Sequence, residues 1–128
     1  MEEWFRAIEY NDFKTVKDYI NQGVDINSRD RWGTTALLYA FFRGRENITK
    51  LLLIQPNINI NVTHIIFNDS FIDYNSNRSF LIDYKVQKEI LDNQRDDIIL
   101  LFDKHNLVHP KIKEENPELF QASNWGLI

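Results

Sequence analysis

The stretch that decides the fold runs from Asp30 to Leu53 and has the sequence DRWGTTALLYAFFRGRENITKLLL. Its first residues include an aspartate and a glycine, which favour a turn. Thr35 then predicts a helix N-cap, and the apolar side chains after it recur at helical spacing until Gly44, which is typical of a helix end. A second helix is predicted through Ile48 and the three leucines that follow. The stretch therefore predicts a projecting turn followed by two short helices.

A similar unit lies 33 residues earlier in the chain, where Ala7 corresponds to Ala40. Each copy closes with a related pentapeptide, GVDIN at residues 23–27 and NININ at residues 57–61. The apolar residues of each copy occupy one face of each predicted helix, and a single helix pair cannot bury that face alone. We therefore expect the two pairs to stack, with the two alanines where helices approach closely.

The two copies resemble ankyrin repeats. Residues 35–40, TALLYA, are similar to the T-P-L-H-x-A segment of that family, and residues 23–27 resemble its G-A-D-V-N ending. The resemblance implies a mainly α fold, an ankyrin-repeat-type solenoid of stacked helix-turn-helix units in a single domain of residues 1–128. Repeat 1 would span residues 1–29 and repeat 2 residues 30–61.

The pattern changes after residue 61. Alternating apolar and polar residues followed by polar turn signals predict an enlarged β-hairpin-like insert at residues 62–81. Helical periodicity then returns, and we interpret residues 82–109 as a degenerate third repeat. The tail, residues 110–128, is predicted to form a C-terminal cap with a helix that begins at Pro117, although a disordered terminal peptide is the alternative.

The charge of the chain is uneven. The 128 residues carry a net charge of −4, with 8 acidic and 8 basic side chains in residues 1–60 but 11 acidic and 7 basic in residues 61–128. This distribution argues against a nucleic-acid or anionic-membrane partner and is compatible with a basic protein partner. Whether the chain is a monomer or a dimer stays open.

Nothing in the sequence indicates export or insertion into a membrane. The chain has no cysteine, its first residues lack the features of a signal peptide, and no apolar run approaches the ~20 residues of a membrane helix. We expect a cytoplasmic protein, in the host cytoplasm if the source is a virus or an intracellular bacterium.

The sequence also gives no signal for catalysis. Glycine-rich phosphate loops and nucleophile motifs are absent. His105 and His109 are four residues apart, but Pro110 argues against one continuous helix there, and no third metal ligand is indicated. Helix-start charges and a solvated face explain the acidic residues of the second half: Asp92, Asp96, Asp97 and Asp103. We therefore expect no enzyme activity, no cofactor and no metal.

The resemblance implies non-catalytic protein–protein interaction through hairpin tips and the concave face of the first helices. The positions of this chain that match those places are Glu9, Tyr10, Arg31, Trp32, Thr34, Phe42 and Arg43. Aromatic and arginine side chains are typical of interface hot spots. Packing of Trp32 on its own hairpin, and of Phe42 on a neighbouring helix, is the structural alternative. A dedicated inhibitor or immunity-type protein that occludes an enzyme or toxin is the alternative function.

Overall fold

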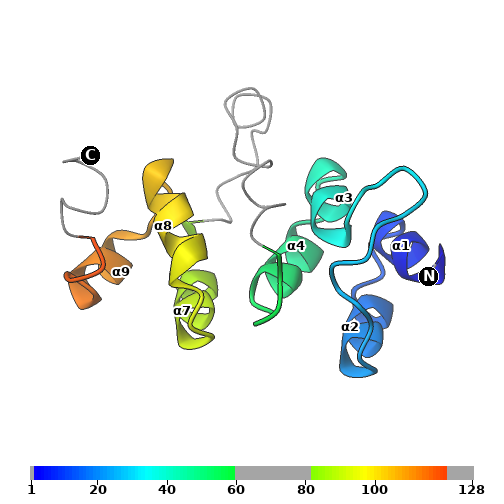
Figure 1. Cartoon of the computed structure of the whole chain (residues 1–128), viewed down its shortest axis with the longest axis horizontal. Helices are drawn as coiled ribbons and strands as arrows, with labels where there is room; N and C mark the ends of the chain where they lie inside the picture. The colour runs from blue at the N-terminus through cyan, green and yellow to red at the C-terminus, as the bar shows by residue number, and fades with distance from the viewer. Residues whose placement is uncertain (1, 60–81, 121–128) are drawn as a thin grey trace.

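The computed structural model describes residues 2–59 and 82–120, and these residues form a row of helices (Figure 1). The seven described helices are α1 (Glu2–Glu9), α2 (Phe13–Asn21), α3 (Ala36–Phe42), α4 (Glu46–Leu53), α7 (Tyr84–Asp92), α8 (Asp96–Lys104) and α9 (Pro110–Glu115). The only β-type pairing in the described residues is one antiparallel bridge between Arg29 and Thr35. The mainly α prediction is therefore confirmed, whereas the hairpin-like insert predicted at residues 62–81 lies entirely outside the described residues.

The first six helices form three pairs with the same connecting turn. The chain leaves the first helix of each pair through a residue in the left-handed region, namely Asn11, Gly44 or Gln94, with φ values of 58°, 71° and 62°. That residue donates its N–H to the carbonyl three residues back, and the next residue donates to the carbonyl five residues back, at 2.8 to 3.1 Å in all three turns. These bonds satisfy carbonyls that the helix end leaves without partners. The third pair thus has the internal geometry of the first two despite its different sequence.

The first two pairs stack in register. α1 packs on α3, and α2 packs on α4. Ala7 and Ala40 are both buried at these contacts, as their small size predicts. The loops after the two pairs are also joined, because Asn27 donates through Nδ2 to the carbonyl of Asn57 at 2.8 Å and accepts through Oδ1 from the amide of Asn59 at 2.9 Å. One asparagine side chain therefore fixes the spacing of the two repeats.

The third pair stacks differently. Its first helix, α7, packs on α4, the second helix of the preceding pair, and Figure 1 shows α7 low beside α4 with α8 above it. The arginine that precedes the second helix of a pair also has different hydrogen-bond partners in the second and third pairs. Arg45 donates to the carbonyl of Glu9, at the end of a first helix, whereas Arg95 donates to the carbonyls of Pro56 and Ile58, in the loop after a second helix. The third pair is therefore turned over relative to the first two, and α7 continues the row formed by α2 and α4.

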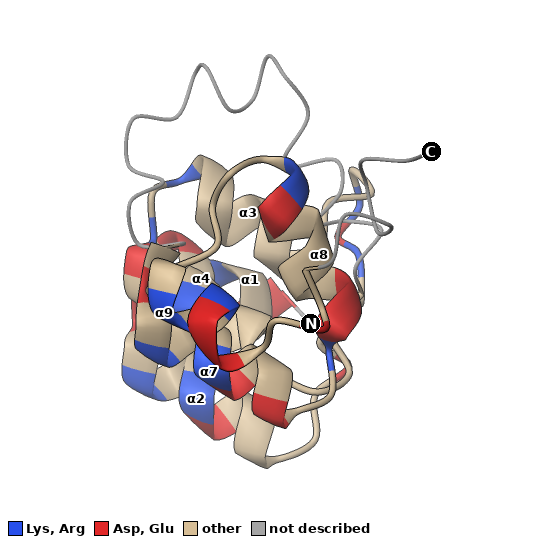
Figure 2. Cartoon of the chain, turned by 90° about the vertical axis from the view of Figure 1, so that its left-hand side faces the viewer, with Lys and Arg blue, Asp and Glu red and all other residues tan. Residues whose placement is uncertain are grey.

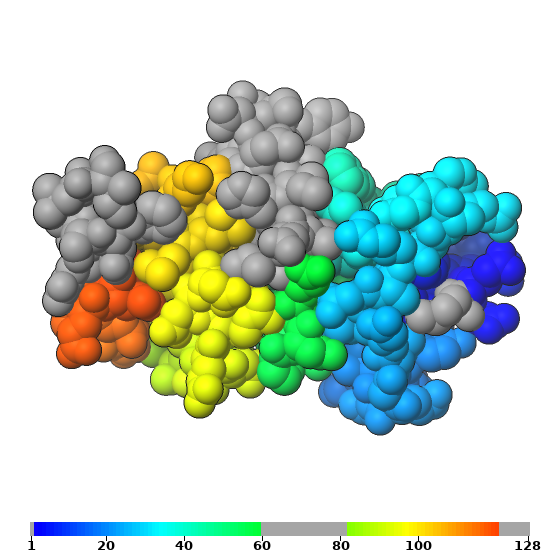
Figure 3. All heavy atoms as spheres, viewed as in Figure 1, coloured from blue at the N-terminus to red at the C-terminus, as the bar shows by residue number. Residues whose placement is uncertain are grey.

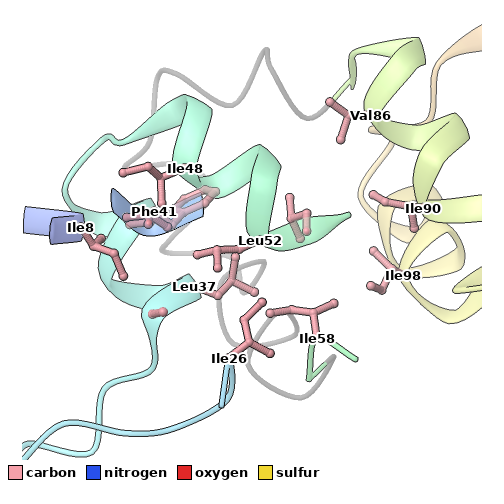
Figure 4. Packing of buried hydrophobic residues seen from close by; sticks show 14 of the residues in the cluster. Ile8, Ile26, Leu37, Phe41, Ile48, Leu52, Ile58, Val86, Ile90 and Ile98 are labelled. Carbon is pink, nitrogen blue, oxygen red and sulfur yellow. The ribbon is translucent and has the colours of Figure 1, made fainter. Parts of the chain in front are cut away.

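One hydrophobic core runs through the described chain. Figure 4 shows Leu37, Leu52 and Ile58 on one side and Ile90 and Ile98, from α7 and α8, facing them from the other. Together with the other buried side chains they form a single cluster that extends from α1 to α9. The space-filling view in Figure 3 shows the resulting elongated body. Shared burial across α4 and α7 therefore holds the turned third pair to the first two.

The last described helix lies earlier than the sequence predicted. α9 begins at Pro110, with His109 as its N-cap and proline at the first helical position, whereas the tail helix was predicted to begin at Pro117. That prediction is wrong, because residues 117–120 form turns. α9 packs on α7, and its Ile112 side chain is buried. Buried Gln87 of α7 holds the segment that leads into α9, because it donates to the carbonyl of Leu107 and accepts from the amide of His109.

Within the described segments, no helix combines the length and the apolar character that crossing a membrane requires.

Candidate binding groove

The turn between the first two helix pairs forms a finger, residues 29–35, whose tip is held by one carboxylate. Asp30 accepts hydrogen bonds through Oδ1 from the amides of Trp32 and Thr34, both at 2.9 Å. Backbone bonds between Asp30 and Thr34 and from Gly33 to Asp30 close the turn, and Gly33 has a φ of +79°, which favours glycine. Arg29 donates to the carbonyl of Gly33 across the base. The finger is therefore shaped by its own side chains, as an aspartate and a glycine in this short stretch predict.

The finger forms one wall of a groove of about 630 Å³. α1 forms the second wall with residues that share one helix face, and α3 closes the end. The lining side chains are Glu2, Phe5, Arg6, Glu9, Arg29, Asp30, Arg31, Trp32, Thr34, Tyr39 and Arg43. Figure 3 shows the finger, in cyan, protruding next to α1, in blue, at the N-terminal end of the molecule.

The floor of the groove joins α1 to α3 by aromatic and charged contacts. The rings of Phe5 and Tyr39 meet edge to face with centroids 6.4 Å apart. The Tyr39 hydroxyl donates to the Glu9 carboxylate at 2.5 Å, and Arg43 lies 3.4 Å from the same carboxylate and over the Tyr39 ring. The hydrogen bond to Glu9, together with burial, raises the pKa of Tyr39 above its ordinary value of 10.0, against the opposing charge of Arg43. These contacts give the floor a defined shape before any partner arrives.

The tip of the finger presents an arginine stacked on a tryptophan. The Arg31 guanidinium lies 5.0 Å from the centroid of the Trp32 ring and 3.5 Å from the Glu2 carboxylate of α1. Trp32 is 77% exposed, so neither contact covers its ring. A large aromatic side chain held open beside a groove is the kind of group that anchors a protein interface.

Comparison with protein families matches residues 5–53 to the family model described as ankyrin repeats (many copies). Residues 5–53 are ankyrin repeats. The matched segment begins within α1, includes the rest of both stacked helix pairs and the finger between them, and ends at the last residue of α4. The comparisons with curated proteins and with solved structures give no match. Ankyrin repeats generally mediate protein–protein interactions.

The ankyrin geometry brings five of the seven predicted binding residues together. The residues that line the groove are Glu9, Arg31, Trp32, Thr34 and Arg43. Tyr10, 70% exposed at the end of α1, and Phe42, 56% exposed at the end of α3, lie outside the lining. Trp32 does not fold back onto its own hairpin. Whether any of the seven contacts a partner stays a prediction.

Sequence reasoning missed the residues that build the groove around these positions. Tyr39 lies one helical turn before Arg43 and could have been found by that spacing, because residues four apart share a helix face. Glu2, Phe5 and Arg6 share a face with Glu9 for the same reason. Phe5 was assigned to the core, and it is in fact 92% buried while its ring also lines the groove. No periodicity could show that one side chain serves both surfaces.

A second, smaller cleft marks the junction of the turned third pair. It has a volume of about 350 Å³ and lies between α2, α4 and α7. Leu51, Ile54 and Val86 give it an apolar lining, and the ion pair between Lys50 and Asp83, at 3.8 Å, stands at its edge. Its position shows again that α2, α4 and α7 form one row.

Two of the residues that could suggest chemistry, His109 and Asp103, have structural contacts at α9. His109 accepts from the amide of Lys111 as the N-cap of α9, and its ring meets the Tyr84 ring edge to face. Asp103 forms an ion pair with Lys113 of α9 at 3.1 Å. Within residues 2–59 and 82–120, no three His, Asp or Glu side chains gather in a way that could hold a metal ion.

Proposed function

We propose that this chain binds another protein through the groove between the finger and α1, with Trp32 as the central anchor. The observation that carries the proposal is the open Trp32 ring, which a single carboxylate and an arginine stack hold beside a preformed groove. Ankyrin repeats typically bind proteins, and apart from Glu2 the residues that line the groove lie within the matched segment. Binding requires little rearrangement of such a site, so less conformational entropy is lost when a partner associates.

The free energy that burial of the exposed Trp32 ring would contribute supports a binding role for it. A tryptophan side chain left in water forgoes the gain of roughly 1.5–3 kcal/mol that burial of a large apolar side chain gives. The fold could recover part of this gain by laying the ring on α1, yet the finger holds it outward. Covering by a partner would supply the missing burial.

The test is capture of the partner by the whole chain and by two matched variants. Trp32→Ala removes the anchor, and Phe13→Ala removes an exposed aromatic side chain of α2 that lies outside the groove and outside the predicted binding positions. Both changes affect exposed positions, so we expect the free energy of unfolding to change by less than about 1 kcal/mol. A protein captured from the native cell should then be purified and its Kd measured for all three chains.

We expect Trp32→Ala to weaken that Kd at least about tenfold, the effect of losing a hot spot, and Phe13→Ala to leave it unchanged. A captured protein that binds the Trp32→Ala chain as tightly as the unaltered one would contradict the proposal. A single stoichiometric partner with an enzymatic or toxic activity that the chain suppresses would favour the inhibitor or immunity-type role, whereas several weak partners would favour a general adaptor.

A further inference from the structure

We infer that the groove takes a partner segment that carries carboxylates next to an apolar side chain. This inference rests on the proposed function, and it names the chemistry of the partner at the same groove. Three observations carry it: the charge of the lining, the state of the groove's own carboxylates, and the apolar surface between the arginines.

The groove is locally basic in an acidic chain. Its lining contains four guanidinium groups, from Arg6, Arg29, Arg31 and Arg43, against the three carboxylates of Glu2, Glu9 and Asp30. The whole chain has a net charge of −4. The sequence is compatible with a basic partner because residues 61–128 carry an excess of acidic side chains. The groove lies in the other half of the chain, so that excess does not describe the charge of the groove. Figure 2, seen from the C-terminal end, shows acidic and basic residues interspersed over the helices without separation by sign.

The carboxylates of the groove already have partners within the chain. Asp30 accepts from two finger amides, and Glu9 accepts from Tyr39 and pairs with Arg43. Glu2 is paired with Arg31, but both side chains are highly exposed, at 78% and 70%, and a pair of this kind contributes little stability. A carboxylate from a partner can therefore replace Glu2 beside Arg31 at little cost.

The arginines retain unused donors. A guanidinium carries five N–H donors, and it binds a carboxylate best through two of them in parallel. Arg29 donates one bond to the carbonyl of Gly33, and Arg31 makes one contact to Glu2 at 3.5 Å. Arg6 forms no ion pair with another described residue. A carboxylate of the partner would meet two guanidinium groups. One is that of Arg31, which stacks on Trp32 and has free N–H donors, and the other is that of Arg6.

The apolar surface between them distinguishes a protein segment from a nucleic acid. Trp32 and the Phe5–Tyr39 floor offer burial to an apolar side chain. A nucleic-acid backbone needs several neutralised phosphates for useful affinity, whereas this groove has an excess of only one positive charge because it contains three carboxylates of its own. A basic segment would meet the surplus guanidinium groups. An acidic segment with an apolar residue matches both features.

The experiment uses a phage-displayed library of random peptides, selected on the full chain at low salt. Enriched peptides are synthesised and their Kd values measured for the unaltered chain and three variants. Trp32→Ala removes the anchor, Arg31→Glu reverses the charge at the groove, and Lys14→Glu makes the same charge change on α2, where Lys14 is 87% exposed and outside the groove. Circular dichroism of each variant confirms that it is folded.

We expect enriched peptides to combine Asp or Glu with an aromatic or aliphatic residue. Their binding should weaken roughly tenfold or more with Trp32→Ala and with Arg31→Glu, remain within about twofold with Lys14→Glu, and decrease as salt rises. Neutral or basic peptides that bind in a Trp32-dependent manner would overturn this inference and leave the proposed function intact. Peptides whose affinity is indifferent to Trp32, or no enrichment, would overturn the inference, and the Kd of the captured protein would then decide the proposed function separately.

Discussion

At the scale of single residues, side-chain oxygens and left-handed residues fix the backbone conformation where helices begin and end. Thr35 caps α3 and Asp12 caps α2 through side-chain oxygens, as their positions before apolar runs predict. Gly44 ends its helix with a positive φ, also as predicted. Local hydrogen bonding of this kind depends on residues a few places apart, which is why the sequence alone was sufficient.

The first prediction concerns Asp30. Asp30→Ala removes the acceptor of two amide hydrogen bonds, and because net contributions are about 1 kcal/mol each, we expect the free energy of unfolding to fall by roughly 1–2 kcal/mol. Asp30→Asn keeps an oxygen in the same place and should retain most of the stability. Urea unfolding measures both. Equal losses in the two variants would show that the charge of Asp30, not its acceptor oxygen, stabilises the finger.

The second prediction concerns the response of Tyr39 to alkaline pH. Its pKa is higher in the folded chain than the ordinary 10.0, so the folded state keeps a proton that the unfolded state loses. The stability from the Tyr39–Glu9 bond is therefore fully present below pH 10.0 and is lost as pH rises through the folded pKa. Tyr39→Phe should cost about 1 kcal/mol near pH 8.

The measurement is urea unfolding of the unaltered and Tyr39→Phe chains from pH 8 into the alkaline range. The difference in unfolding free energy should narrow as pH rises above 10.0. Tyr84, whose pKa is also raised by a hydrogen bond to Glu115, is present in both chains and does not affect the difference. A difference that stays constant, or widens, would show that Tyr39 does not donate to Glu9.

At the scale of elements, the sequence predicted the six helices of the three pairs and misplaced the helix that follows them. Asn116-Pro117 has the preferred pattern of an N-cap residue followed by proline, whereas histidine is not a preferred N-cap residue, so local sequence favours a helix start at Pro117 over one at Pro110. The choice depends on Ile112, which α7 buries, and on Gln87, which is 20 or more residues away in sequence. A contact at that separation leaves no periodic signal near the helix it selects.

The third prediction tests Gln87 as the residue that directs the chain into α9. Gln87→Leu leaves a buried carbonyl at Leu107 and a partly buried amide at His109 without their partner, and we expect a loss of roughly 1–3 kcal/mol in the free energy of unfolding. Lys85→Ala, an exposed change on the same helix, should stay within about 0.5 kcal/mol. Hydrogen exchange should also quicken at the His109 amide. An unchanged exchange rate would mean that another group holds this turn.

At the scale of the whole molecule, the sequence predicted helix pairs but not how the third pair is oriented. The pattern of each pair specifies an apolar face, and a face can be covered by either helix of its neighbour. The family match ends at residue 53 and does not include the third pair. Whether residues 82–109 descend from an ankyrin repeat stays a prediction. Its orientation depends on contacts such as those of Arg95, which no spacing of apolar residues could reveal.

The fourth prediction concerns Arg95 as the link between the two parts of the molecule. Its side chain is 16% exposed and donates to the carbonyls of Pro56 and Ile58. Arg95→Ala leaves these acceptors unpaired and should lower the free energy of unfolding by roughly 1–3 kcal/mol. Since the third pair depends on this contact, unfolding of the two parts should also separate.

Separation is measured with the fluorescence of Trp4, buried in α1, in a chain with Trp32→Phe and Trp125→Phe. The fluorescence and circular dichroism midpoints in urea should coincide before the Arg95→Ala change and diverge after it. Lys104→Ala, an exposed control at the end of α8, should leave them coincident. Coincident transitions in the Arg95→Ala chain would show that apolar packing alone couples the two parts.

The turned third pair also limits how large a complex this molecule can form on its first-helix side. α1 and α3 are the two described helices that pack side by side there, because α7 lies in the other row and α8, which is on the side of α3, packs mainly on α7. A stable complex between folded proteins commonly covers about 800 Å² on each side, which ordinarily draws on several successive repeats. Two short helices and one finger suit a linear motif better than a domain. Such a ligand would exchange rapidly, so its occupancy would follow the local concentration of the motif, and several linked copies of the motif would be needed for lasting attachment.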